Sequence, residues 1–361
     1  TNGLFSGSIA GTGGLIKEGA GTETLTGSNT FTGGTVISAG TLAIGAGGSL
    51  AANGAVNVAA VGTGFDISAG GNQSIGVLNG VTGSTVTLGA NTLTLGGVGN
   101  GNYDGVIAGT GGLVKNGAGV QELGGANLFT GGVTLNAGGL LLGNNGALGT
   151  GALTVGGNAT LDTNAALTIA NTISLTGGTD LDLLGTNALT LGGAISGAGG
   201  LTKDGAATVT LTGANTYTGG TTINSGTLAI GAAGSLASTG AVNFTGTGTL
   251  DISAGGNQTI GSLAGVAGSA VALGGNTLSL GGATDATFNG SIGGSGGLVK
   301  NGTGVQTLGG ANSFTGGVTL NAGGLIVGNN AALGTGALTV GGASTLDSAS
   351  AITLANNIVL N

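Results

Sequence analysis

The chain has 361 residues, of which 90 are glycine and only 4% are charged, and its net charge is -8 at pH 7. Because it contains no cysteine or histidine, it lacks the usual ligands of zinc, copper and haem and the usual nucleophile–base pairs. We therefore expect no enzyme activity, no cofactor, and no catalytic, cofactor-binding or metal-binding residues. The absence of proline excludes collagen, and a helical array is disfavoured because each glycine costs about 1 kcal/mol in a helix.

The distribution of charge also limits the partners. The four positive side chains are all lysines, and they are widely separated along the sequence. Binding to a phosphate backbone needs clustered basic residues, so nucleic acid is not an expected partner. Thr, Ser and Asn interrupt every apolar stretch well before the ~20 residues that a spanning helix needs. We expect no membrane insertion by this segment.

In chain order, one phrase returns four times. Each copy begins with Gly-Leu-x-Lys, and twelve residues after the lysine it continues with Asn-x-Phe/Tyr-Thr-Gly-Gly. The lysines are Lys17, Lys115, Lys203 and Lys300, and the second phrases begin at Asn29, Asn127, Asn215 and Asn312. The copies define related units of about 90 to 100 residues, and repeats of this kind favour a stacked architecture over one central core.

Alternate units are the closer relatives. The spacing from Lys17 to Lys203 and the spacing from Lys115 to Lys300 differ by a single position. The run Phe65–Gln73 returns as Leu250–Gln258 with only its first residue changed. We therefore predict that residues 1–361 form a single continuous β-solenoid of four related units, produced by a tandem duplication with a period of about 185 residues.

The strand signals within a unit are short alternating runs closed by glycine. Examples are Thr41–Gly45, Thr92–Gly96, Ala152–Gly156 and Thr227–Gly231. Such strands are too short to form a stable hairpin sheet alone. Stacked as parallel rungs, they would pair with equivalent strands above and below and bury one continuous aliphatic column. At about 20 residues a rung, the chain would make a rod of roughly 18 rungs.

The corners between these strands have their own signals. Glycine is expected where a corner needs a positive φ. The four repeated asparagines, which sit at a fixed corner, are expected to hydrogen-bond to neighbouring backbone.

One copy of the repeat, from Gly197 to Leu228, resembles the passenger-associated repeat of bacterial autotransporters, with residue types matched in order over the whole stretch. The four copies, each of about 35 residues, cover more than a third of the chain. The resemblance implies an all-β, right-handed parallel β-helix that belongs to a longer passenger. It also implies export through the outer membrane of a Gram-negative bacterium, with display at the cell surface or release outside the cell.

Three sets of residues are candidates for binding. The four lysines would form either a ligand-binding stripe or solvated polar corners, and we expect the second, with counter-charges at Glu18 and Asp204. The aromatic residues Phe31, Phe129, Tyr217 and Phe314 would form either a sugar-stacking row or a buried set that fills the interior or shields a corner, and we expect the second. Asp180 and Asp182 share one strand face, but the calcium-binding nonapeptide is not repeated around them, so we expect no calcium site.

These observations predict a non-enzymatic, secreted or cell-surface structural rod or adhesin, such as a stalk or extracellular fibre with a role in biofilm or matrix. The alternative is a carbohydrate- or host-surface-binding module on one face of the solenoid. A polysaccharide-cleaving enzyme would need clustered carboxylates, and those of this chain are scattered. Expected partners are other copies of the chain, joined end to end or laterally through unpaired strand edges, and a surface glycan or matrix.

Overall fold

The computed structural model describes residues 1–361. It contains 43 β-strands, no cis peptide bond and no helix that would be able to span a membrane. Within each unit the strands stack in parallel as a β-solenoid, with about 18 turns in the whole chain, which confirms the predicted fold class. The chain divides into two compact units, Thr1–Thr176 and Gly177–Asn361. The joining of both units into one continuous solenoid stays a prediction.

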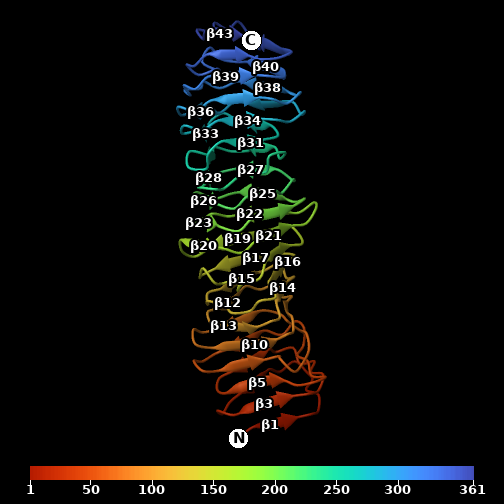
Figure 1. The fold of residues 1–361 in the computed structure, drawn as a ribbon. Coiled ribbons are helices and arrows are strands. Elements are labelled where there is room, and N and C mark those ends of the chain that lie inside the picture. Colours follow the sequence, from red (N-terminus) through yellow and green to blue (C-terminus); the bar gives the residue numbers. More distant parts are fainter. The chain divides into compact units, whose positions relative to one another are not determined.

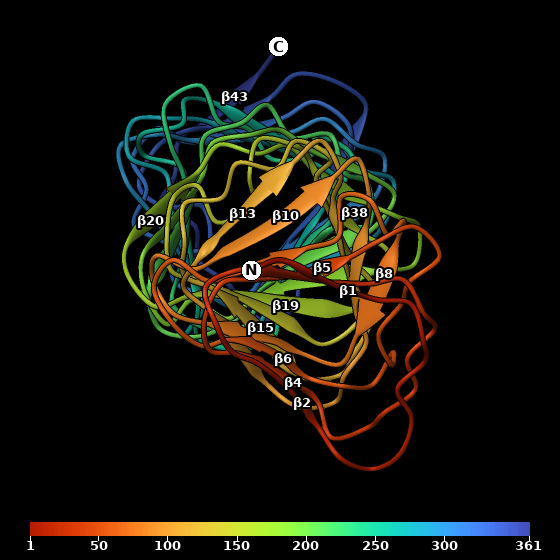
Figure 2. The ribbon, with the colours of Figure 1, turned by 90° about the horizontal axis from the view of Figure 1, so that it is seen from below.

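The strands of the first unit lie on three sides of each turn, as Figure 2 shows for β5 and β10, for β4 and β6, and for β8. The first parallel sheet contains β1 (Gly3–Phe5), β3 (Thr22–Leu25), β5 (Thr41–Ile44), β7 (Gly64–Asp66), β10 (Thr85–Gly89) and β13 (Val106–Gly109). The second contains β2 (Leu15–Lys17), β4 (Thr35–Ile37), β6 (Val56–Val58), β9 (Leu78–Gly80), β12 (Gly101–Tyr103), β15 (Val120–Leu123), β17 (Gly139–Leu142) and β19 (Ala159–Thr163). The third contains β8 (Gln73–Ile75), β11 (Leu93–Leu95), β14 (Leu113–Lys115), β16 (Val133–Leu135), β18 (Leu153–Val155) and β21 (Ile173–Leu175), and β20 (Leu167–Ile169) completes the unit.

The second unit repeats this arrangement, and its strands follow one another from green to blue in Figure 1. One parallel sheet contains β22 (Asp180–Leu183), β25 (Gly200–Lys203), β27 (Thr221–Ile223), β29 (Val242–Phe244), β32 (Leu263–Gly265), β35 (Ala286–Phe288), β38 (Val305–Leu308), β40 (Gly323–Val327) and β42 (Ser344–Ser348). Another contains β23 (Leu189–Leu191), β26 (Thr208–Leu211), β28 (Thr227–Ile230), β30 (Thr249–Asp251), β33 (Ala270–Ala272) and β36 (Ser291–Gly293). The third contains β31 (Gln258–Ile260), β34 (Leu278–Leu280), β37 (Leu298–Lys300), β39 (Val318–Leu320), β41 (Leu338–Val340) and β43 (Ile358–Leu360), and β24 (Ile195–Gly197) completes the unit.

The register of the strands fixes the length of a turn and the core. In the first unit Leu93 pairs with Leu113, Leu113 with Val133 and Val133 with Leu153. Each of these turns therefore takes about 20 residues, as a solenoid repeat does. These aliphatic side chains are at most 3% exposed. Because side chains alternate between the two faces of a strand, every turn adds one member to the same inward column. The predicted stacking of short aliphatic runs is confirmed.

The two glycines that end the repeated phrase have different roles, which the third copy illustrates. Gly220 has a φ of 89°, a conformation that glycine adopts at little cost. A Cβ on Gly219 would overlap the backbone of Gly199 in the preceding turn. The corner therefore needs one glycine for backbone conformation and one for close approach. The predicted use of glycine at the corners is confirmed there.

Candidate functional site

The four lysines point into the protein, so the prediction of solvated corners is wrong. Their exposed fractions are 8% for Lys17, 3% for Lys115, 0% for Lys203 and 5% for Lys300. The ammonium of Lys17 donates hydrogen bonds to the backbone oxygens of Glu18 (3.1 Å), Gly19 (2.7 Å) and Ala39 (2.9 Å). Ala39 belongs to the next turn, so this lysine ties two turns together.

The other three lysines have the same kind of partners. Lys203 donates to the backbone oxygens of Asp204 (2.6 Å), Gly205 (2.8 Å) and Ser225 (3.3 Å). Lys115 donates to the oxygens of Gly117 and Ala137, and Lys300 donates to that of Gly302. Glu18 and Asp204 thus offer their backbone oxygens to the ammonium groups.

Side chains alternate between inward and outward along the repeated phrase, and this alternation explains why the lysines point inward. The sequence analysis missed this signal. Leu113, Val114 and Lys115 form one strand, β14, with the burial order buried, half-buried, buried. Lys115 is in register with Leu95 and Leu135, so its aliphatic stem fills a position in a leucine column. Long charged side chains often bury the stem in this way while the charged end reaches polar groups.

Burial lowers the pKa of two of these lysines. It lowers the pKa of Lys115 below its ordinary value of 10.5 because the ammonium loses hydration. It also lowers the pKa of Lys300, where the nearby carboxylate of Asp285 opposes the shift. The backbone oxygens that accept from each ammonium partly replace the lost water. These groups bind the protein's own backbone and so do not form a ligand-binding stripe.

The repeated asparagines are buried beside this corner and join successive turns, as predicted. Asn127 accepts a hydrogen bond from the backbone NH of Ile107 (2.8 Å) and donates one to the backbone oxygen of Ala147 (2.6 Å). Ile107 lies in the preceding turn and Ala147 in the following one, each 20 residues away. Asn29, Asn215 and Asn312 make equivalent pairs of bonds. The asparagine therefore acts as a bridge across three turns.

The four repeated aromatic residues lie in the interior, as predicted. Phe31 is 3% exposed, and Phe129, Tyr217 and Phe314 are fully buried. The hydroxyl of Tyr217 forms a hydrogen bond with that of Thr221 at 2.6 Å, and burial raises the pKa of this tyrosine to about 12. Because these rings are out of reach of a ligand, the alternative of a sugar-stacking row is wrong for them.

Asp180 and Asp182 share the outward face of β22, as their spacing predicts. Burial raises the pKa of Asp182, the nearby charge of Asp204 raises it further, and Lys203 lowers it. No group of three or more acidic residues in the structure is arranged to hold a metal ion.

Buried glutamines are a feature that the sequence analysis missed. Gln73, Gln121, Gln258 and Gln306 are at most 4% exposed. The side chain of Gln73 accepts from the backbone NH of Leu50 (3.4 Å) and donates to the backbone oxygen of Gly48 (3.1 Å), both in the preceding turn. The signal was available, because these glutamines recur with the period of the duplication.

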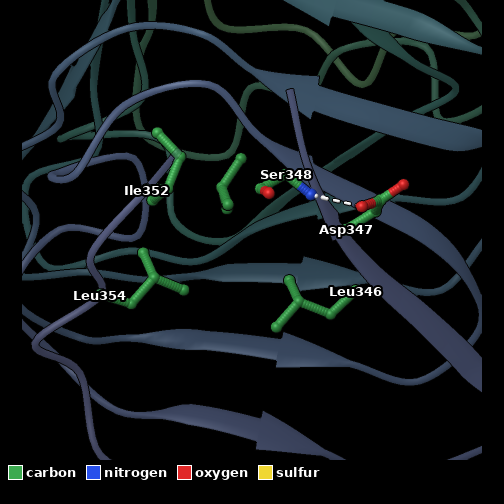
Figure 3. A pocket seen from close by; sticks show the side chains of 6 residues that line it. Leu346, Asp347, Ser348, Ile352 and Leu354 are labelled. Atoms are coloured by element: carbon green, nitrogen blue, oxygen red, sulfur yellow. Dashed lines mark hydrogen bonds between the residues drawn. The ribbon is translucent and has the colours of Figure 1, made fainter. Parts of the chain in front are cut away.

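A hollow of about 240 Å³ lies at the last described turn, and Figure 3 shows it. Leu346, Ile352 and Leu354 line it, together with Asp347, whose carboxylate accepts a hydrogen bond from the backbone NH of Ser348 at 2.7 Å. The lining residues lie on one face of this turn. In earlier turns, the turn that follows covers the equivalent face. The hollow is therefore the interior of a turn rather than a site shaped for a small ligand.

Comparison with known proteins supports the repeat that the sequence suggested. The family model for the passenger-associated transport repeat matches at four places, residues 15–44, 113–142, 201–230 and 298–327. A stretch of 129 residues is 36% identical to the adhesin BmaC autotransporter of Brucella suis biovar 1 (strain 1330). That match covers 34% of this chain and 4% of the relative. No solved structure matches the chain.

Each matched segment coincides with the same elements of the fold. The match at residues 113–142, for example, starts at β14, passes the Asn127 corner and ends with β17. The family pattern therefore describes the buried lysine, the asparagine bridge, the buried aromatic ring and the glycine corner as one structural group. The chain therefore carries four passenger-associated transport repeats on a parallel β-solenoid and is homologous to an autotransporter adhesin, which implies a location at the outer-membrane surface or outside the cell of a Gram-negative bacterium.

Proposed function

We propose that this chain is a non-enzymatic adhesive scaffold, which holds repeated polar faces away from the cell for contact with a host surface or matrix. The likeness to an adhesin autotransporter supports the adhesive role. The observation that carries the scaffold role is the division of each turn into a buried inner face and an outer face of small polar residues. In the third sheet of the first unit, one outward column contains Ser74, Thr94, Val114, Thr134, Thr154 and Ser174.

The positions of the charged groups support the non-enzymatic part of the proposal. All twelve carboxylate side chains are half-buried or exposed, and they are dispersed along the turns. All four lysines are engaged by backbone oxygens. Acid–base and electrostatic catalysis need such groups to converge on one reacting atom.

The adhesive role is tested by display of the 361-residue chain on Gram-negative cells through a heterologous translocator. We expect cells that carry the chain to resist shear on host-cell and matrix-coated surfaces better than cells that carry the translocator alone. Equal retention of the two cell populations would refute the adhesive role. Turnover of a polysaccharide or peptide by the purified chain would refute the non-enzymatic part.

Self-association is a further part of the proposal. The outer strand β43 pairs only with β41, and its residues Ile358, Val359 and Leu360 are 44 to 77% exposed. Unpaired edges and apolar interiors are covered in a solenoid by another turn, which either the same chain or a second copy supplies. Sedimentation velocity should show larger species as the concentration rises, and a constant monomer would count against association.

A further inference from the structure

Two shallow hollows open on the outer surface, one in each unit, at positions related by the period of the duplication. The first hollow, of about 270 Å³, is lined by Asn79, Asn100, Asn102, Val120, Glu122 and Leu141. The second hollow, of about 330 Å³, is lined by Asp285, Ala286, Thr287, Val305, Thr307 and Ile326. Their recurrence shows that the fold produces them, although most of the lining residues differ.

In the interior beside the first hollow, a large ring packs against a glycine of the neighbouring strand. Strands β9 and β12 share a single register pair, Gly80 with Tyr103. A Cβ on Gly80 would lie 2.6 Å from the ring of Tyr103, so only glycine leaves room for it. The second unit repeats this arrangement with Gly265 and Phe288.

A buried glutamine crosses the same region. Gln121 donates a hydrogen bond to the backbone oxygen of Leu78 at 2.8 Å, across 43 residues and therefore past a whole intervening turn. It passes at Gly101, where a Cβ would overlap its side-chain oxygen. Gly101 also lines the first hollow. Gln306 makes the same bond to Leu263 at 2.9 Å.

The outward residues beside each hollow form a matching column. In the first unit, Asn102, Glu122, Leu141 and Asp162 are consecutive register partners. In the second unit, Thr287, Thr307, Ile326 and Asp347 occupy the equivalent places. Neighbouring strands lie about 4.8 Å apart. Each column therefore places polar groups, one aliphatic side chain and one aspartate in that order.

Carboxylates at the rim of each hollow are held in place. Glu122 accepts a hydrogen bond from the side-chain amide of Asn164 at 2.6 Å. Asp285 accepts one from the backbone NH of Val305 at 2.7 Å. Because every lysine is buried and the chain has no arginine or histidine, no basic side chain lines either hollow. The ammonium of Lys300 interacts with the charge of Asp285 but does not line the second hollow. The lining side chains therefore favour a cationic ligand.

We propose that each hollow binds one amino-sugar ring of a polysaccharide that carries free amino groups. The carboxylates pair with the ammonium group, and Val120 and Leu141, or Val305 and Ile326, contact the apolar face of the ring. Volumes of about 270 and 330 Å³ are at the lower limit for ligand pockets and suit a single ring. The proposal deepens the proposed adhesive function, on which it rests for its biological meaning.

A lysine side chain of a partner protein also has an aliphatic part and a positive charge. An ammonium group only donates hydrogen bonds. The hollows contain donors as well as acceptors, namely the amide of Asn102 and the hydroxyls of Thr287 and Thr307. The hydroxyls of a sugar both donate and accept, so they match this mixture. We therefore favour the sugar and treat the lysine peptide as an outcome of the test.

The test is calorimetry of the 361-residue chain with four probes: glucosamine hexamer, N-acetylglucosamine hexamer, glucose hexamer and a lysine-rich peptide. Loss of the charged pair should weaken binding about tenfold, so we expect the glucosamine hexamer to bind about tenfold more tightly than the two uncharged sugars. Equal affinity for the three sugars would overturn the proposal. Tighter binding of the peptide than of the glucosamine hexamer would also overturn it.

The duplication supplies variants that the fold already accepts. Glu122→Thr and Asp285→Asn each introduce the residue that the other unit carries at the equivalent position. The double variant should bind the glucosamine hexamer about tenfold more weakly. The control is Glu18→Asn with Asp204→Asn, which removes the same charge and introduces the residue found at the same place in the other repeats.

The control variant should keep the affinity of the unchanged chain. An equal loss in control and test variants, or no loss in the test variant, would overturn the site. If displayed cells adhere but the purified chain does not bind the glucosamine hexamer, the sugar site fails and the adhesive function stands. If the purified chain binds it and displayed cells do not adhere, the adhesive function fails and the site stands.

Discussion

The buried lysine corner gives the sharpest test of how the turns are held together. Lys17→Met keeps an unbranched side chain in the inward column and removes the ammonium that donates to three backbone oxygens. Because the corner is partly buried and water can reach some of these oxygens, we count the net loss as one hydrogen bond to a charged group, about 2 kcal/mol. Lys17→Ala also removes three methylenes at about 0.8 kcal/mol each, for a total of about 4 kcal/mol.

Hydrogen exchange measures this effect locally, which matters because the turns of a solenoid need not unfold together. The amides of Ser38 and Ala39 donate to the backbone oxygen of Lys17 and report on the corner. A loss of about 2 kcal/mol should make them exchange roughly 30-fold faster in Lys17→Met, and the loss in Lys17→Ala should be larger.

The matched control for this experiment is Ile16→Thr on the same strand. Ile16 is 63% exposed, and Thr202 occupies the equivalent place in the third repeat. This change should therefore alter stability by less than about 0.5 kcal/mol. If both Lys17 variants exchange like the unchanged chain, the ammonium lies in solvent and the reasoning about the corner is refuted.

Three further predictions concern the interior. Burial raises the pKa values of Tyr103 and Tyr217 to about 12, whereas tyrosine in the unfolded chain titrates near 10. Between these pH values the folded chain keeps the two protons and the unfolded chain loses them. The free energy of unfolding should therefore fall from about pH 10 to 12 by about 3 kcal/mol per tyrosine. Urea denaturation at about pH 8 and about pH 11.5 should show a smaller fall for Tyr217→Phe, and an equal fall would contradict the assignment. Asn127→Ala should lower the free energy of unfolding by about 3 kcal/mol, because it leaves a buried NH and a buried backbone oxygen without their partner. Urea denaturation that matches the unchanged chain would disprove the bridge. Gly80→Ala should destabilise the chain by about 1 to 3 kcal/mol through overlap with the ring of Tyr103, and Tyr103→Leu should restore part of that loss in the double variant; no restoration in thermal unfolding would argue against this contact.

The sequence alone determined the repeat, the parallel stacking of short strands and the inward position of the aromatic rings. These features follow from local patterns, because the alternation of side chains sets which face is buried and a fixed period sets which strands meet. The bridging role of the repeated asparagines was predictable for the same reason, since a short amide side chain at a fixed corner reaches only nearby backbone.

The alternation within β14 marks Lys115 as inward, but only the tertiary structure decided which groups the buried lysines and glutamines bind. The turns above and below Lys115 provide both a leucine column for its stem and backbone oxygens for its ammonium. Gln121 reaches a partner 43 residues away, which no local pattern specifies. The hollows depend on the tertiary structure in the same way, because each is lined by residues from successive turns.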